Sequence, residues 1–290
     1  MTSLKEVKTR IASVGNMKKI TQARQMVSSA QLHRVQMALE KTTVYKEALD
    51  RLITGLLINN DRGESPFIQK QSSGSIAIVI MSSNTGMCGA FNANMIKVLQ
   101  NIHIGYPGEK FLFFPIGKKI REAVERAGYD TGYEADQHAD HLAGKITYEE
   151  SAEMAVHLME LYSTQKVKHV ELVYYHFKNM GKQEIKGVTL LPYSIPSAHH
   201  IQKVEVERDF IFEPSGKEVL KNILLMTIKS NFYYALMQNQ TSEHGARTMA
   251  MQLATENADQ VLSELRLTYN KLRQQNITSE LLDIIGSSFV

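Results

Sequence analysis

The chain has 290 residues, 43% of them hydrophobic, and a formal net charge of +3 at pH 7. This composition excludes wholesale disorder, and the length allows two domains or one domain with an extended element. The single cysteine excludes an internal disulfide, and neither a signal-peptide pattern nor an apolar run of about 18 residues is found, so we expect a soluble or peripheral protein.

Residues 3–58 are predicted to form a long helix, because the first proline is Pro66 and Ser3 and Glu6 have the spacing of a capping box. Its apolar stripe has a 3–4 spacing with one slip in register and runs through Leu4, Val7, Ile11, Val14, Met17, Ile20, Val27 and Ala30. Residues 1–36 carry seven lysines and arginines against one acid. Such a helix could bind nucleic acid, but without interleaved aromatic residues an acidic protein surface is at least as good a partner.

The middle of the chain has the texture of an α/β domain. Continuous apolar runs indicate buried strands, and alternation of apolar and polar residues indicates two further, antiparallel strands; the four lie at 75–81, 110–116, 167–178 and 184–194. Helical patterns occupy 92–102, 118–127 and 147–164. This order of strands and helices favours a Rossmann-like domain with a partly parallel sheet.

Three features of this domain invite a chemical interpretation. The glycine-containing turn at 82–92 could hold phosphate, but it has neither a GxGxxG pattern nor a Walker A lysine, so a tight structural turn is favoured. Cys88 has no visible catalytic partner and is interpreted as a small buried residue. His138, Asp140 and His141 could contact a metal but lie in an acidic loop with no further ligand indicated. We therefore expect no catalytic, metal or cofactor site.

Residues 219–285 are predicted to form a second, longer helix. Steps of three and then four residues pass through Ile223, Met226, Ser230, Tyr233, Met237, Gln240, His244, Arg247, Met251, Ala254, Ala258, Val261, Leu265, Thr268 and Leu272. A register of this length predicts a coiled-coil seam, and residues 3–58 are the simplest antiparallel partner. Polar residues on this seam either set the register or mark a contact with another protein, since a buried arginine is costly unless it is paired.

The predicted fold class is therefore α/β, with a long antiparallel coiled coil of the terminal helices and an inserted Rossmann-like domain. The predicted divisions are 1–58 for the N-terminal coiled-coil helix, 74–196 for the α/β domain and 209–286 for the C-terminal coiled-coil helix.

Several stretches resemble the gamma subunit of F-type ATP synthases, in its bacterial form. They are LKEVKTRI at 4–11, KITQA at 19–23, MV at 26–27, SSNTGMCGAFN at 82–92, EHGARTMAM at 243–251, ATENA at 254–258, YNK at 269–271 and ITSEL at 277–281. The resemblance implies a non-catalytic rotor shaft that couples proton-driven c-ring rotation to ATP synthesis or hydrolysis. Its expected partners are the alpha and beta subunits, the epsilon subunit and the c ring.

The resemblance also implies contact residues and a location. Met26, with Lys18, Lys19 and Arg24 around it, matches a contact with an acidic lever of beta. Arg247 and Gln274 match hydrogen bonds to a beta loop, Thr278 and Glu280 match a coupling-sensitive pair near the tip, and Phe210, Phe212 and Glu213 match the foot on the c ring. The implied location is peripheral, on the cytoplasmic face of the cell membrane, where the complex transports hydrogen ions.

Two departures from the family pattern bear on these residues. Gln22, Gln25, Gln31 and His33 stand where relatives are usually basic or apolar, and Thr85 replaces the usual arginine of the middle turn. We expect Arg247→Ala to weaken coupling or assembly while leaving the isolated chain folded. The alternative functions are a coiled-coil scaffold or nucleic-acid-binding adaptor, and a nucleotide-dependent enzyme.

Overall fold

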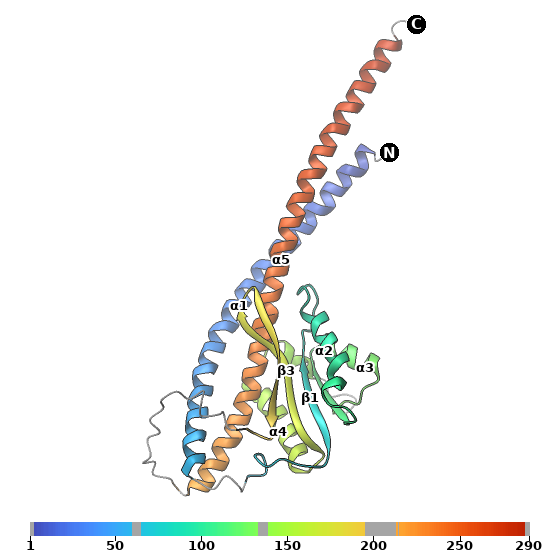
Figure 1. The fold of residues 1–290 in the computed structure, drawn as a ribbon. Coiled ribbons are helices and arrows are strands. Elements are labelled where there is room, and N and C mark those ends of the chain that lie inside the picture. Colours follow the sequence, from blue (N-terminus) through green and yellow to red (C-terminus); the bar gives the residue numbers. More distant parts are fainter. Residues whose placement is uncertain (1–2, 60–64, 133–138, 195–212, 214, 288–290) are drawn as a thin grey trace.

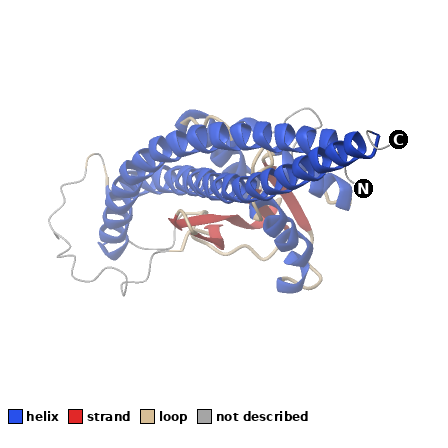
Figure 2. Cartoon of the chain, turned by 90° about the horizontal axis from the view of Figure 1, so that it is seen from above, coloured by secondary structure: helices blue, strands red, loops and turns tan. Residues whose placement is uncertain are grey.

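The computed structural model of the chain describes residues 3–59, 65–132, 139–194, 213 and 215–287. Two long helices, α1 (Leu4–Asn59) and α5 (Gly216–Ser287), run antiparallel, and a small α/β unit packs against their lower part (Figure 1). Seen from above, the sheet lies on one side of the helix pair (Figure 2). None of the helices in the described ranges is long and apolar enough to cross a membrane.

The sheet has four strands, β1 (Ser75–Met81), β2 (Phe111–Ile116), β3 (Val167–Asn179) and β4 (Lys182–Leu191), in the order β2-β1-β3-β4. The strand β1 pairs in parallel with β2 and β3, and β3 forms an antiparallel hairpin with β4. The predicted α/β class and the partly parallel sheet are therefore confirmed.

Both faces of the sheet are covered, as the buried strand β1 requires. Successive side chains of a strand point to opposite faces. Ile76, Ile78 and Ile80 accordingly join a core with the helices α2 (Phe91–Gly105) and α3 (Lys118–Ala127). Ala77, Val79 and Met81 join a second core with α4 (Tyr148–Ser163), the end of α1 and the first part of α5. A short 3-10 helix, η1 (Ala139–Ala143), closes this side.

The seam of α1 corrects the predicted slip in register. One unbroken 3–4 spacing of buried and half-buried side chains runs through Leu4, Val7, Ile11, Val14, Lys18, Thr21, Gln25, Ser28, Leu32, Val35, Leu39 and Thr42. Met17, Ile20 and Val27, which the hydrophobic pattern placed on the seam, are each more than half exposed, and Ala30 is exposed too. The helix keeps its winding because polar residues on the seam find partners on α5. The hydroxyl groups of Thr21 and Thr255 hydrogen-bond at 2.9 Å, and Lys18 Nζ lies 2.5 Å from Asp259 Oδ1.

The observed seam of α5 differs from the predicted one at every second position, where the seam residue lies one place later in the sequence. Its upper half buries or half-buries Met251, Thr255, Ala258, Leu262, Leu265, Tyr269 and Leu272. The steps are thus four and then three, and the predicted seam members Val261 and Thr268 are exposed. Val261 and Leu262 are adjacent and equally apolar, so hydropathy cannot choose between them. Leu262 lies on the seam because its side of α5 faces α1.

The lower half of α5 is a core helix of the α/β unit as well as a coiled-coil strand. Leu224, Ile228, Phe232, Ala235 and Leu236 are all buried in the same core as the sheet residues. Met226, which the heptad count placed on the seam, is exposed. This part of α5 packs on two sides, against α1 and against β3 and α4, so that a single seam does not describe it.

Candidate partner-binding surfaces of the helix pair

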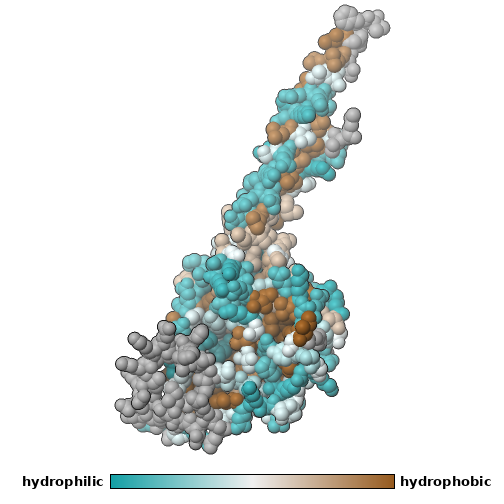
Figure 3. Space-filling view, in the orientation of Figure 1, coloured by the Kyte–Doolittle hydropathy of each residue, from teal (hydrophilic) through white to brown (hydrophobic). Residues whose placement is uncertain are grey.

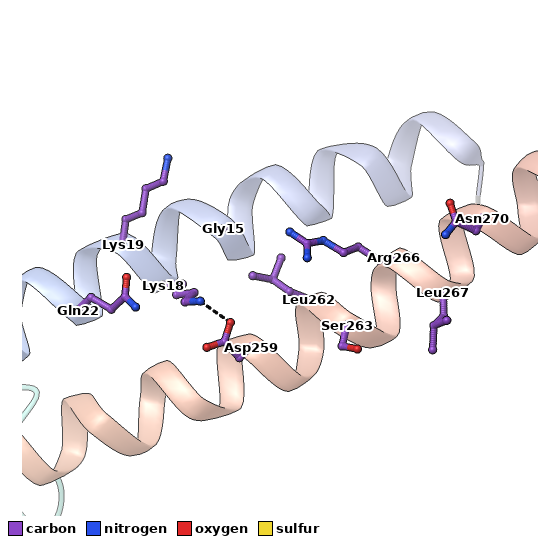
Figure 4. A pocket seen from close by; sticks show the side chains of 10 residues that line it. All are labelled: Gly15, Lys18, Lys19, Gln22, Asp259, Leu262, Ser263, Arg266, Leu267 and Asn270. Atoms are coloured by element: carbon purple, nitrogen blue, oxygen red, sulfur yellow. Dashed lines mark hydrogen bonds and ion pairs between the residues drawn. The ribbon is translucent and has the colours of Figure 1, made fainter.

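A basic groove lies between α1 and α5 in the upper half of the pair. It encloses about 450 Å³ and is lined by Gly15, Lys18, Lys19 and Gln22 of α1 and by Asp259, Leu262, Ser263, Arg266, Leu267 and Asn270 of α5. Lys18 points across to Asp259, Arg266 extends between the two helices, and Lys19 points away from the pair (Figure 4).

The groove holds three cationic side chains against one carboxylate. Asp259 neutralises Lys18, whereas Arg266 and Lys19 have no acidic partner in the described ranges. Such an excess of positive charge favours and steers contact with an acidic protein segment. Sequence reasoning named Lys18 and Lys19 but missed Arg266. The signal that could have found it is the true seam, since Arg266 follows the seam residue Leu262 by one helical turn on the same face.

Met26 and Arg24 are presented outward from α1. Met26 is 72% exposed, and its neighbour Val27 is exposed as well. Arg24 lines a shallow hollow of about 340 Å³ together with Arg247, which lies more than 200 positions later in the sequence. The structure therefore brings Arg24 and Arg247, two of the predicted contact residues, together at this hollow, which Val27 also lines. Contact of Met26, Lys18, Lys19 and Arg24 with another protein stays a prediction.

Arg247 is tied down within its own chain. Its side chain is only 9% exposed. Its Nη2 lies 2.7 Å from the Glu243 carboxylate and donates to the Thr85 hydroxyl at 3.0 Å. Burial raises the pKa of Glu243, and the charge of Arg247 opposes that rise. Arg247 thus joins α5 to the turn that follows β1, and its predicted hydrogen bond to a partner stays a prediction.

The end of α5 projects beyond the start of α1, as the helix lengths predicted (Figure 1). Gln274, Thr278 and Glu280 are exposed there, and the Thr278 hydroxyl donates to the Gln274 carbonyl at 2.9 Å. Apolar patches alternate with polar ones along this projecting part (Figure 3). They include Ile277, Leu281, Leu282, Ile284 and Ile285. At the opposite end Glu213 is exposed, whereas Phe210 and Phe212 lie outside the described residues.

The turn at 82–92 is occupied by hydrogen bonds within the chain. Asn92 Oδ1 accepts from the Ser83 amide at 3.2 Å and from its hydroxyl at 2.9 Å, and Ser82 Oγ accepts from the Ile120 amide at 3.0 Å. Cys88 is buried and lies 3.2 Å from Asn92 Nδ2. These bonds support the interpretation as a structural turn.

The acidic loop contains an ion pair. The Asp140 carboxylate lies 2.9 Å from Arg121 Nη2, and His138 lies outside the described residues. In the ranges that the structure describes, no group of three or more histidine, cysteine, aspartate or glutamate side chains could hold a metal ion.

His244 makes the stability of the chain depend on pH. Burial, and secondarily the charge of Arg247, lower the pKa of His244 from 6.5 to about 4. The unfolded chain therefore binds a proton at His244 before the folded chain does. The contribution of the neutral His244 to the free energy of unfolding is fully present above about pH 6.5. This contribution, about 3 kcal/mol, is lost as the pH falls to about 4.

The measurement is the free energy of unfolding by urea at pH 7 and pH 4, for the native chain and for His244→Gln. The loss is expected to be about 3 kcal/mol smaller in the variant. Because Glu243 is present in both chains, its opposite contribution cancels in the comparison. His33→Gln, on the exposed face of α1, is the matched control. Parallel pH curves for the native chain and His244→Gln would contradict the assignment.

Comparison with known proteins gives a match along the whole chain. The model of the ATP synthase family matches residues 3–288. The ATP synthase gamma chain of Bacteroides thetaiotaomicron is 42% identical over 301 residues, which cover 99% of each chain. The chain belongs to the ATP synthase gamma-chain family. The gamma chain of Parabacteroides distasonis is 40% identical and covers 100% of this chain and 99% of its own.

Solved structures share the gamma-chain fold at low sequence identity. A chain of the Euglena gracilis mitochondrial ATP synthase, in a structure of OSCP, F1 and c-ring, superposes with a TM-score of 0.62 at 18% identity and covers 99% of this chain and 93% of that one. A chain of the Tetrahymena thermophila mitochondrial ATP synthase central stalk and c-ring gives 0.58 at 20% identity, with coverage of 81% and 99%.

Proposed function

We infer that the chain is the central rotor shaft of an F-type ATP synthase. The observation that carries this inference is the match to gamma chains over nearly the full length of both proteins. The geometry fits the role, since two antiparallel helices form a long shaft whose tip projects from a folded base. Its partners are the alpha and beta subunits, into whose ring the shaft extends, and the epsilon subunit and c ring at the base.

We further propose that the chain carries no catalytic group and that catalysis belongs to the beta subunits. A shaft acts on a catalytic site only through contacts that differ between the conformations of that site. The basic groove and the outward side chains of α1 provide contacts of this kind, because the groove lies on one flank of the seam and Arg24 and Val27 line a different hollow, so that the pair presents different surfaces in different directions. On this proposal the protein is peripheral, held at the cytoplasmic face of the cell membrane by its partners, and takes part in hydrogen-ion transport.

The basic groove provides the test of the contact with the alpha and beta ring. Lys19→Glu and Arg266→Glu, each in the assembled complex, reverse charges that have no acidic partner within the described ranges. Each is expected to lower ATP-driven proton pumping about fivefold, the effect of losing an exposed charge contact of about 1 kcal/mol. Added salt should narrow the difference from the native complex, because exposed charges are screened.

Lys97→Glu, on the exposed face of α2, makes the same charge change away from the shaft and should leave pumping unchanged. Unaltered pumping and unaltered assembly in both groove variants would remove the groove from the contact surface. Isolation of the native complex separates the broader alternatives. The rotor function requires a ring of ATPase subunits, whereas a scaffold or adaptor would carry nucleic acid and an enzyme would carry a bound nucleotide.

A further inference from the structure

A second cavity lies where the helix pair meets the α/β unit. It encloses about 490 Å³, which is within the usual size range of small-molecule sites. Its walls come from four places in the sequence: α1 near Arg34, α5 between Tyr233 and Arg247, the turn at 84–85, and the loop at 143–146. Since these segments are distant in sequence, the fold itself creates the cavity.

Hydrogen bonds fix the frame of this cavity. Gln240 of α5 donates to the Gly144 carbonyl, which ties the loop to the helix. Asn84 Nδ2 donates to the Asp140 carbonyl at 2.8 Å, and Asn84 Oδ1 accepts from the Lys118 amide at 3.0 Å. The turn and the loop are therefore held in place relative to each other before any ligand arrives.

The charges around the cavity are mostly positive. Arg34, Lys145 and Arg247 line it, against the single carboxylate of Glu243. Glu243 already pairs with Arg247. Arg34 and Lys145 are exposed at the mouth and have no acidic partner among the residues that the structure describes. Arg34 and Lys145 are thus available to bind an anion from solution.

The inner wall contains polar atoms whose hydrogen-bonding capacity is unused. Arg247 Nε and His244 Nδ1 are buried, and neither has a hydrogen-bond partner in the described part of the chain. Both side chains line the cavity and are at least nine-tenths buried. Arg247 Nε is a donor, and leaving a buried donor unmatched is costly. This atom therefore supports an acceptor in the space beside it, whereas His244 Nδ1 can donate or accept according to its tautomer.

We propose that this cavity binds a phosphate-bearing anion, with Arg34 and Lys145 at its mouth and Arg247 and His244 at its inner wall. Arginine suits this ligand, because its planar guanidinium matches the geometry of phosphate oxygens and makes charge-assisted hydrogen bonds. The site is separate from the basic groove, since the two share no lining residue. Anion binding there would be a property additional to the shaft function, at the joint of the shaft and the base. The ligand is either free phosphate or a nucleotide.

The test uses the full-length chain and isothermal titration with inorganic phosphate and, separately, with ADP, at matched ionic strength. Saturable binding of phosphate is expected, and Arg34→Gln and Lys145→Gln should each weaken it about fivefold. Lys41→Gln, which removes an exposed charge of α1 outside the cavity, should bind as the native chain does. Tighter binding of ADP in competition with phosphate would identify a nucleotide as the ligand, and weaker binding of ADP would identify free phosphate.

A second readout reports on the inner wall. A bound anion beside Arg247 would offset the positive charge that lowers the pKa of His244, so the His244 imidazole should titrate at higher pH in phosphate than in chloride, as followed by NMR. The proposal is overturned if neither phosphate nor ADP binds the chain. It is also overturned if binding is the same in Arg34→Gln, Lys145→Gln and the native chain.

Discussion

Replacement of Arg247 by alanine is expected to destabilise the chain by about 3–5 kcal/mol, the usual effect of removing one partner from a buried ion pair. Glu243, which is 5% exposed, would lose its countercharge, and the Thr85 hydroxyl would lose the donor of its hydrogen bond. The free energy of unfolding in urea measures the change. The sequence-based expectation is that the isolated variant chain stays folded, and the structure adds the ion pair with Glu243 that sets the size of the expected loss.

A double variant separates the unpaired charge from the lost packing. Apolar residues of similar volume can replace a buried ion pair at little cost. Glu243→Leu combined with Arg247→Met should therefore be more stable than Arg247→Ala alone. The loss in Arg247→Ala should also be smaller at pH 5 than at pH 8, because burial raises the pKa of Glu243 and a neutral carboxyl needs no countercharge. A single variant as stable as the native chain would contradict the account.

Replacement of Phe232 by alanine should cost about 3–5 kcal/mol, the range for removing a buried phenyl ring. Phe232 is 0% exposed and lies in the core that joins α5 to the sheet. The variant should therefore loosen the base from the shaft as well as lower the free energy of unfolding, measured in urea. Leu267→Ala, at a side chain 69% exposed on the same helix, is the control and should change stability by less than about 0.5 kcal/mol. Equal losses in the two variants would show that this core does not hold the joint.

Elements of the α/β unit are predictable from the sequence where local signals agree. The strand at 75–81 was predicted with its observed bounds, because a run of isoleucine and valine between polar segments has few alternatives. The helix at 118–127 was also predicted with its observed bounds, and Gly128 ends it in a left-handed conformation that favours glycine. The division into 1–58, 74–196 and 209–286 remains a prediction.

The coiled coil is less predictable because its register depends on the partner helix. On α1 the seam passes through Lys18 and Thr21, which a count of apolar residues rejects, while Met17 and Ile20 point outward. Only the facing residues Thr255 and Asp259 explain this choice. The same limit applies to the candidate sites, since the place of Arg266 in the groove and the contact of Arg247 with Thr85 depend on packing between segments that are far apart in the sequence.

The outward apolar side chains of α1 link the stability of this chain to its assembly. Met17, Ile20, Met26 and Val27 add little to the stability of the helix pair, because each is more than half exposed. Their hydrophobic free energy is gained only when another protein covers them. Such a protein binds the folded form and not the unfolded one, so by mass action it raises the apparent stability of the chain with its own concentration. The apolar residues that hydropathy placed on the seam therefore couple the folding of this chain to the binding of its partner.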